Sequence, residues 1–120
     1  MAHDVDLAPR LRDVLATEPG LTEQRMFGGL AFMLDGNMAV AASGQGGLMV
    51  RIVPDDADRL LARKGARRVE MNGRALNGWL RIDDAELRTA RQLTSWVRIG
   101  VRFARTLPPT SARSRGVRPD

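Results

Sequence analysis

The order of elements along this 120-residue chain predicts an α+β fold built mainly from hairpins. Two dipeptides, Asp35-Gly36 and Asn72-Gly73, suit two-residue turns in which both central positions need positive φ. Three other stretches instead repeat apolar residues every three or four positions, which is the period of a helix. The predicted order is α-β(3)-α-β(2)-α, with a mainly antiparallel sheet and helices packed against it.

Composition excludes several classes of protein. Three Phe, two Trp and no Tyr leave aliphatic residues and Met to fill the core of one modest domain. The chain has no Cys, so it has no disulfide framework, no thiolate nucleophile and no sulfur ligand for a metal. No apolar run approaches the roughly 18 to 20 residues that span a bilayer, and the polar, acidic N-terminus is unlike a secretory signal. We therefore expect no membrane contact and a cytoplasmic location.

The first helix is predicted over residues 6–18. Leu7, Leu11 and Leu15 fall on one apolar stripe. Asp6 suits the N-cap and Pro9 the first turn, and Gly20 follows the expected end.

A bent hairpin is predicted next, over residues 25–42, with the turn at Asp35-Gly36. Apolar residues alternate before and after this turn, and Gly28-Gly29 indicates a bulge or sharp bend. A third strand is expected over Leu48 to Val53.

The glycine-rich segments Gly28-Gly29 and Gly44 to Gly47 both lead into strands, whereas a phosphate-binding loop leads into a helix N-terminus. We therefore interpret both segments as turns.

The second half repeats the alternation of helix and hairpin. Pro54 to Arg63 is predicted as a helix, and the second hairpin covers residues 67–82 with a bulge at Asn77-Gly78 before Trp79. The last helix is expected from Asp83, which with Glu86 resembles a capping box, to Leu107. Residues 1–109 then form the domain, and 110–120 an Arg-containing disordered tail.

These motifs resemble a known family. The hairpin sequence RMFGGLAFMLDGNM, the strand LMVRI, the segment NGWLRID and the closing SWVRIGVRFARTLPP are similar to TfoX N-terminal domains of TfoX/Sxy-type competence regulators. The similarity runs from about Leu7 to Pro109, and the fold it implies is α-β(3)-α-β(2)-α. The structural motif residues of the two hairpins are Met26, Phe27, Gly28, Gly29, Asp35, Gly36, Asn72, Gly73, Gly78 and Trp79.

The resemblance implies a small regulatory or protein-binding module without catalytic residues. Members that control competence carry a second, C-terminal domain, so we expect a stand-alone single-domain member and carry over only the domain type. Many relatives have an aromatic residue where this chain has Ala39.

Candidate catalytic and metal-binding residues are few. Asp55, Asp56 and Asp58 could suggest a divalent metal, but no His accompanies them and their place in a first helical turn explains two of them. His3 is the only His, and it has no evident carboxylate or nucleophile partner. We therefore expect no enzyme activity, no metal and no cofactor.

The basic residues give the best candidate surface. The net charge of +5 comes from 19 basic residues, of which only Lys64 is a lysine. Arg25 precedes the bend, and it either pairs with a carboxylate, shields a strand edge or meets a partner. The remaining candidates share one arc of the last helix, opposite its apolar face: Arg88, Arg91, Arg98, Arg102 and Arg105.

This arc is interpreted as a solvated face, a site for an acidic protein or a site for nucleic acid. No aromatic residue interleaves with it, so only sequence-nonspecific phosphate contact is expected if it binds nucleic acid. The leading hypothesis is a non-enzymatic module that acts through protein–protein contact, with a homodimer as one candidate assembly through its strand edges. The alternative is a weak nucleic-acid-binding accessory protein that uses the Arg arc and the basic tail.

Overall fold

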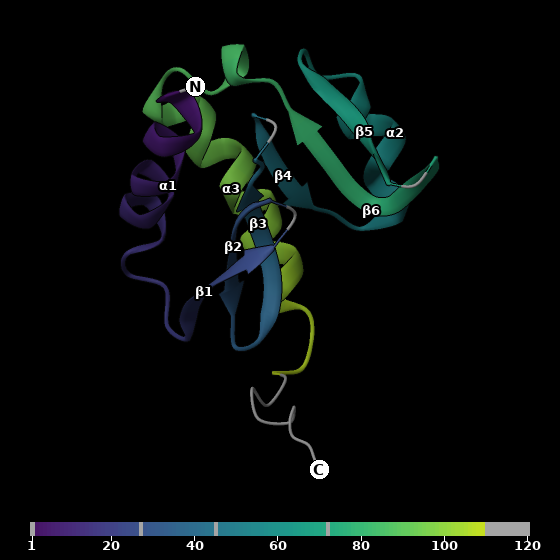
Figure 1. Ribbon diagram of the computed structural model, residues 1–120. Helices are drawn as coiled ribbons and strands as arrows, with labels where there is room; N and C mark the ends of the chain where they lie inside the picture. The colour runs from purple at the N-terminus through teal and green to yellow at the C-terminus, as the bar shows by residue number, and fades with distance from the viewer. Residues whose placement is uncertain (1, 27, 45, 72, 110–120) are drawn as a thin grey trace.

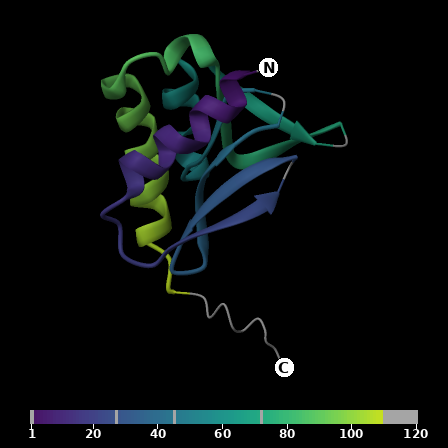
Figure 2. The same cartoon turned by 60° about the vertical axis from the view of Figure 1, so that its left-hand side comes forward.

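The helices and strands form two layers, with the helices against one face of the sheet (Figures 1 and 2). The computed structural model describes residues 2–26, 28–44, 46–71 and 73–109. Its six strands form one antiparallel sheet in the order β1-β2-β3-β4-β6-β5. The predicted α+β class is therefore confirmed. The predicted tail at 110–120, Phe27 and Asn72 lie outside the described residues.

The strands are β1 (Leu21–Met26), β2 (Gly29–Leu34), β3 (Asn37–Ala42), β4 (Leu48–Arg51), β5 (Ala66–Met71) and β6 (Arg74–Ile82). The helices are α1 (Ala2–Leu15), α2 (Ala57–Leu61) and α3 (Ala90–Arg105), and the short 3-10 turns η1 (Pro54–Asp56) and η2 (Asp84–Glu86) precede α2 and α3.

Four strands precede α2, where the sequence predicted three. The additional strand β1 has the sequence LTEQRM, and its residues from Thr22 to Arg25 are exposed at one edge of the sheet. Without a buried face, the strand shows no apolar alternation that a sequence pattern could detect. Gly28-Gly29 is accordingly the reversal between β1 and β2, where Met26 pairs with Gly29 and Gly28 has φ 71°.

Both predicted hairpins are present. Asp35 and Gly36 have φ of 51° and 84°, as the expected turn requires. Gly73 has φ 77° between β5 and β6. The expected bulge also occurs, since the β5–β6 register shifts between Arg68 and Glu70, opposite the part of β6 that contains Gly78. Gly78 has φ 91°, and its carbonyl accepts a hydrogen bond from the Ile52 N–H at 2.8 Å, so the bulge is fixed to the end of β4.

Two predicted helix starts are wrong. The helix α3 begins at Ala90 rather than near Asp83, and its capping box is formed by Thr89 and Gln92, each of which hydrogen-bonds the backbone N–H of the other. The Asp83 carboxylate instead accepts two hydrogen bonds from Arg67, at 2.9 and 3.1 Å. Helix α1 covers 2–15 rather than 6–18, so Asp6 is not its N-cap and Pro9 lies inside it.

The main core lies between the sheet and α1, α2 and α3. Its fully buried side chains include Leu11, Phe32, Leu48, Ile82 and Leu93. Gly100 brings α3 close to β3, since a Cβ built on it would stand 2.3 Å from the Ala39 carbonyl oxygen. On the opposite face of the sheet, Trp79 packs in a smaller cluster around Met49 and Val69. The sheet is thus the common base on which α2 and α3 are both positioned.

Candidate functional site

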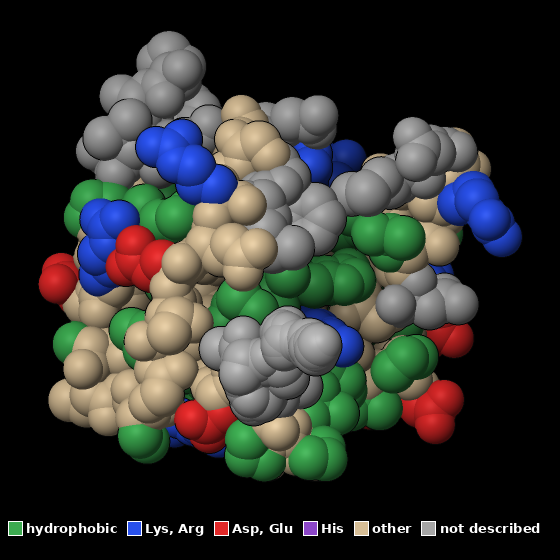
Figure 3. Space-filling model, turned by 60° about the horizontal axis from the view of Figure 1, so that its bottom comes forward, with side chains coloured by type: hydrophobic (Ala, Val, Ile, Leu, Met, Phe, Trp, Pro, Cys, Tyr) green, Lys and Arg blue, Asp and Glu red, His purple; other side chains and the backbone are tan. Residues whose placement is uncertain are grey.

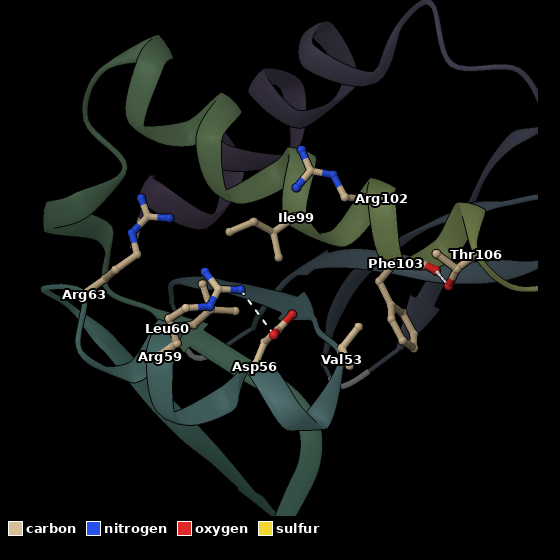
Figure 4. Close-up of a pocket in the computed structure, with 9 residues that line it drawn as sticks. All are labelled: Val53, Asp56, Arg59, Leu60, Arg63, Ile99, Arg102, Phe103 and Thr106. Atoms are coloured by element: carbon tan, nitrogen blue, oxygen red, sulfur yellow. Dashed lines mark hydrogen bonds and ion pairs between the residues drawn. The ribbon is translucent and has the colours of Figure 1, made fainter.

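A groove of about 330 Å³ separates α2 from α3 (Figure 4). One wall comes from the turn after β4, from η1 and from α2 with the residues that follow it, and the other comes from the last two turns of α3. The lining combines apolar side chains with three arginines and one carboxylate. These residues are Val53, Asp56, Arg59, Leu60, Arg63, Ile99, Arg102, Phe103 and Thr106.

Local sequence explains how the first wall is built. Pro54 opens η1 at a position where its fixed φ suits a helical start. Ala57 and Leu60 are buried toward the core, which turns the intervening residues outward. Among the described residues, Val53 is the only exposed large hydrophobic side chain, at 40% of its surface, and it lies in this groove.

The second wall comes from the edge of the apolar face of α3. Ile99 and Phe103 are four residues apart, so they lie one above the other on the helix. Both are half-buried, whereas Trp96, Val97 and Gly100 on the same helix are buried. The apolar face of α3 is therefore wider than the sheet can cover, and the excess forms part of the groove.

The three groove arginines differ in their contacts. Arg59 forms an ion pair with Asp56 at 3.3 Å. The Arg63 guanidinium lies 3.9 Å from the ring centroid of Trp96 and donates a hydrogen bond to the Ser95 hydroxyl at 3.2 Å. Arg102 is exposed and has no ion pair with any side chain that the structure describes. The groove therefore carries excess positive charge beside an apolar floor.

The five arginines of the predicted arc do not all lie exposed on one helix. Arg91, Arg98 and Arg102 are exposed on α3, whereas Arg88 lies before the helix begins. Arg105 is engaged with the protein itself. It pairs with Glu18 at 2.8 Å and with Asp35 at 3.1 Å, and it donates to the Pro19 carbonyl at 2.9 Å. Arg105 thus joins the end of α3 to the segment before β1 and to the β2–β3 turn.

Arg25 lies apart from this helix, on the edge strand β1. It is exposed and stands opposite Leu30 of β2. It lines a shallow hollow of about 420 Å³ together with Arg12 of α1 and the Gly28-Gly29 turn. None of the carboxylates in the described part of the chain forms an ion pair with it. A role for Arg25 in shielding the strand edge fits this position, and its contact with a partner stays a prediction.

Two of the three acidic candidates, Asp56 and Asp58, are engaged in ion pairs. Asp56 pairs with Arg59, and Asp58 pairs with Arg68 at 3.3 Å. Across residues 2–26, 28–44, 46–71 and 73–109, no group of three or more His, Cys, Asp or Glu could hold a metal ion. The side chain of His3 lies outside the described part of the structure.

Clear pKa shifts occur at two structural ion pairs outside the groove. The Arg12 side chain donates to both Glu23 carboxylate oxygens, at 2.7 and 2.9 Å. These hydrogen bonds, with the attraction between the two charges, lower the pKa of Glu23 and raise the pKa of Arg12. The paired carboxylate of Asp83 likewise raises the pKa of Arg67. The first pair fastens α1 to β1, and the second fastens β5 to the end of β6.

The face of the molecule in Figure 3 carries both positive and negative side chains. Among the described side chains that Figure 3 shows, basic and acidic groups stand in small separate clusters between hydrophobic and other surface. The described basic side chains therefore do not form one continuous basic surface over that face.

The chain is similar to a known protein family. The family model of the TfoX N-terminal domain matches residues 13–104 of the chain. The chain belongs to the TfoX N-terminal domain family. Searches of curated proteins and of solved structures find no significant match. The match confirms the family predicted from the hairpin and strand motifs, and it includes nearly all of the groove lining in this TfoX N-terminal domain.

Membership of this family suggests a regulatory module. In the described part of this TfoX N-terminal domain, no helix is long and apolar enough to cross a membrane. Sequence reasoning placed the Arg residues of α3 but missed the groove beside them. A signal was present in the unusually broad apolar face of that helix, which extends beyond the stripe that one core contact needs.

Proposed function

We propose that this TfoX N-terminal domain is a non-enzymatic regulatory module that acts in the cytoplasm through protein–protein contact. The observation that carries the proposal is Val53, an exposed hydrophobic side chain in an open groove that is bordered by charge. Apolar centres with polar rims are typical of surfaces that bind protein side chains. Family membership supports the regulatory part of the proposal.

Site-specific photocrosslinking in cells tests this function. A photoreactive amino acid replaces Val53, and a matched control places it at Ala85, which is exposed on η2. We expect a discrete protein adduct from position 53 that is absent from position 85. Adducts of equal pattern at both positions, or none at position 53, would refute protein contact through the groove.

The homodimer is a separate part of the proposal. The two edge strands of the sheet, β1 and β5, are the places where a second copy could extend it. Light scattering at tens of micromolar measures the molar mass directly. A mass of about 13.2 kDa, that of one chain, would remove the dimer from the proposal.

Nucleic acid is the second candidate partner, and the exposed Arg91, Arg98 and Arg102 of α3 favour it. Fluorescence anisotropy with mixed-sequence single- and double-stranded DNA tests it between roughly 50 and 300 mM salt. Binding that persists near 150 mM and is lost with Arg98→Glu and Arg102→Glu would support phosphate contact. Absence of binding at that salt would leave protein contact as the function of this helix.

A further inference from the structure

We infer that the groove between α2 and α3 binds an acidic amphipathic helix of a partner protein. This inference rests on the proposed function and specifies the chemistry of the partner. It requires three properties of the occupant: apolar side chains for the floor, negative charge for the rim, and a backbone that satisfies its own hydrogen bonds. Each property follows from a different observation.

The apolar requirement comes from side chains that the fold covers only in part, including Phe103, which has the Arg51 guanidinium over its ring at 5.1 Å from the centroid. Val53 is 40% exposed, and Ile99 and Phe103 are half-buried on the opposite wall. Leu60, which is 3% exposed, closes the floor between them. An occupant that inserts apolar side chains here removes this surface from water, which favours binding in proportion to the apolar area buried.

The charge requirement comes from the balance of the lining. Three guanidinium groups face one carboxylate, and that carboxylate, on Asp56, is already paired with Arg59. The groove thus has an excess of two positive charges, three minus one. Figure 4 shows Arg63 and Arg102 on opposite walls with Ile99 between them. Acidic side chains at both ends of an apolar cluster would therefore meet opposite charge.

The positive rim and apolar floor together disfavour two other occupants of the groove, the C-terminal segment of this chain and nucleic acid. Residues 110–120 carry three Arg and one Asp, so the segment is itself basic and is repelled by the rim. Nucleic acid could pair its phosphates with the arginines, but it would leave the apolar floor in contact with water or a sugar edge. An acidic polypeptide satisfies the rim and the floor together.

The helical requirement comes from the walls. The groove is lined by side chains of helices and by the turn after β4, and the lining includes no residue of the edge strands β1 and β5. An extended peptide gains its backbone hydrogen bonds by adding to a strand edge. A segment in this groove finds no such edge, so a helix, which bonds its own backbone, fits the site.

A designed peptide serves as the probe. It is a fluorescein-labelled helix with Leu at two positions four residues apart and Glu on either side, and it is titrated with the full chain at 150 mM salt. Two comparison peptides keep the Leu spacing with Lys in place of Glu, or keep the composition with a scrambled order. We expect the Glu peptide to bind at least about tenfold more tightly than either comparison peptide, a difference of about 1.4 kcal/mol.

Two variants locate the site. Arg102→Glu reverses a charge in the groove, and Arg91→Glu makes the same change on the same helix outside it. Both residues are exposed, so neither change disturbs the core. We expect Arg102→Glu to weaken the Glu peptide about tenfold and Arg91→Glu to change it less than about twofold. Val53→Asp should weaken it as Arg102→Glu does.

Several outcomes overturn the inference. Equal binding of the Glu and Lys peptides, equal loss from Arg91→Glu and Arg102→Glu, or no binding of the Glu peptide below about 1 mM would each do so. If the photocrosslink at position 53 still captures a protein in those cases, protein contact stands and only the acidic chemistry is wrong. If the Glu peptide binds as expected while position 53 gives no adduct, the groove chemistry stands and the cellular function is wrong.

Discussion

Replacing Gly100 with alanine tests how closely α3 packs on the sheet. A Cβ at this position would stand 2.3 Å from the Ala39 carbonyl oxygen, 2.9 Å from Val40 Cγ1 and 3.0 Å from the Ala39 carbonyl carbon. The nearest atom belongs to the backbone of β3, which is held on both sides by neighbouring strands. Reaching even a 3.0 Å contact from 2.3 Å needs a displacement of about 0.7 Å.

Two opposing terms give the expected magnitude. Alanine is favoured over glycine inside a helix by about 1 kcal/mol. Overpacking of a well-packed core costs about 1 to 3 kcal/mol, and the upper end applies here because the obstacle is backbone. We expect a net loss of about 2 kcal/mol in the free energy of unfolding, which lowers Tm by about 10 °C.

Urea and thermal unfolding followed by circular dichroism measure this loss. Arg91→Ala is the matched control, because it lies on the exposed side of the same helix and should change stability by less than about 0.5 kcal/mol. An unchanged or raised Tm for Gly100→Ala would show that helix propensity outweighs the contact. That result would contradict the tight packing of α3 against β3 at Gly100.

Three further substitutions test separate contacts. Arg105→Gln removes a guanidinium that pairs with two carboxylates, so the free energy of unfolding in urea should fall by about 1 kcal/mol. An unchanged free energy would show that these two ion pairs do not stabilise the fold. Thr89→Ala removes the N-cap of α3 and should cost about 1 kcal/mol in the same assay, whereas Thr89→Ser should be near neutral. Glu23 has a lowered pKa in the folded protein, so its pairing with Arg12 stabilises the protein above the unfolded pKa of about 4.3 and is lost as pH falls through the folded value. The fall of Tm on acidification below about pH 4.3 should therefore be shallower in Glu23→Gln, and an unchanged slope would contradict this sign.

The sequence predicted most elements whose signal is local. Asp35-Gly36 specified its turn because both residues must adopt positive φ, and the burial of α3 followed from helical periodicity. The capping box was misplaced because Asp83-x-x-Glu86 and Thr89-x-x-Gln92 both fit the pattern. Contacts distant in the sequence distinguish them: the Asp83 carboxylate pairs with Arg67, 16 residues away, and the Asp83 N–H donates to the Gly65 carbonyl at 3.0 Å.

The candidate Arg surface and the groove depend on contacts between residues that are even farther apart in the sequence. Arg105 looks like its neighbours on the helical arc, yet Glu18 and Asp35 engage it from 87 and 70 residues away. The groove brings the turn after β4 and α2 beside the end of α3, and no local pattern connects these segments. Edge strand β1 was missed for a related reason, since its exposed residues carry no periodic signal.

The two walls of the groove rest on different parts of the same sheet. Helix α3 packs on β3 and β4, whereas α2 contacts β5 and β6. The distance between the walls therefore depends on the twist between β4 and β6. A change in that twist would widen or narrow the groove. An occupant that touches both walls would hold the twist at one value. Its binding would then slow hydrogen exchange in the β5–β6 hairpin, beyond the residues that it touches.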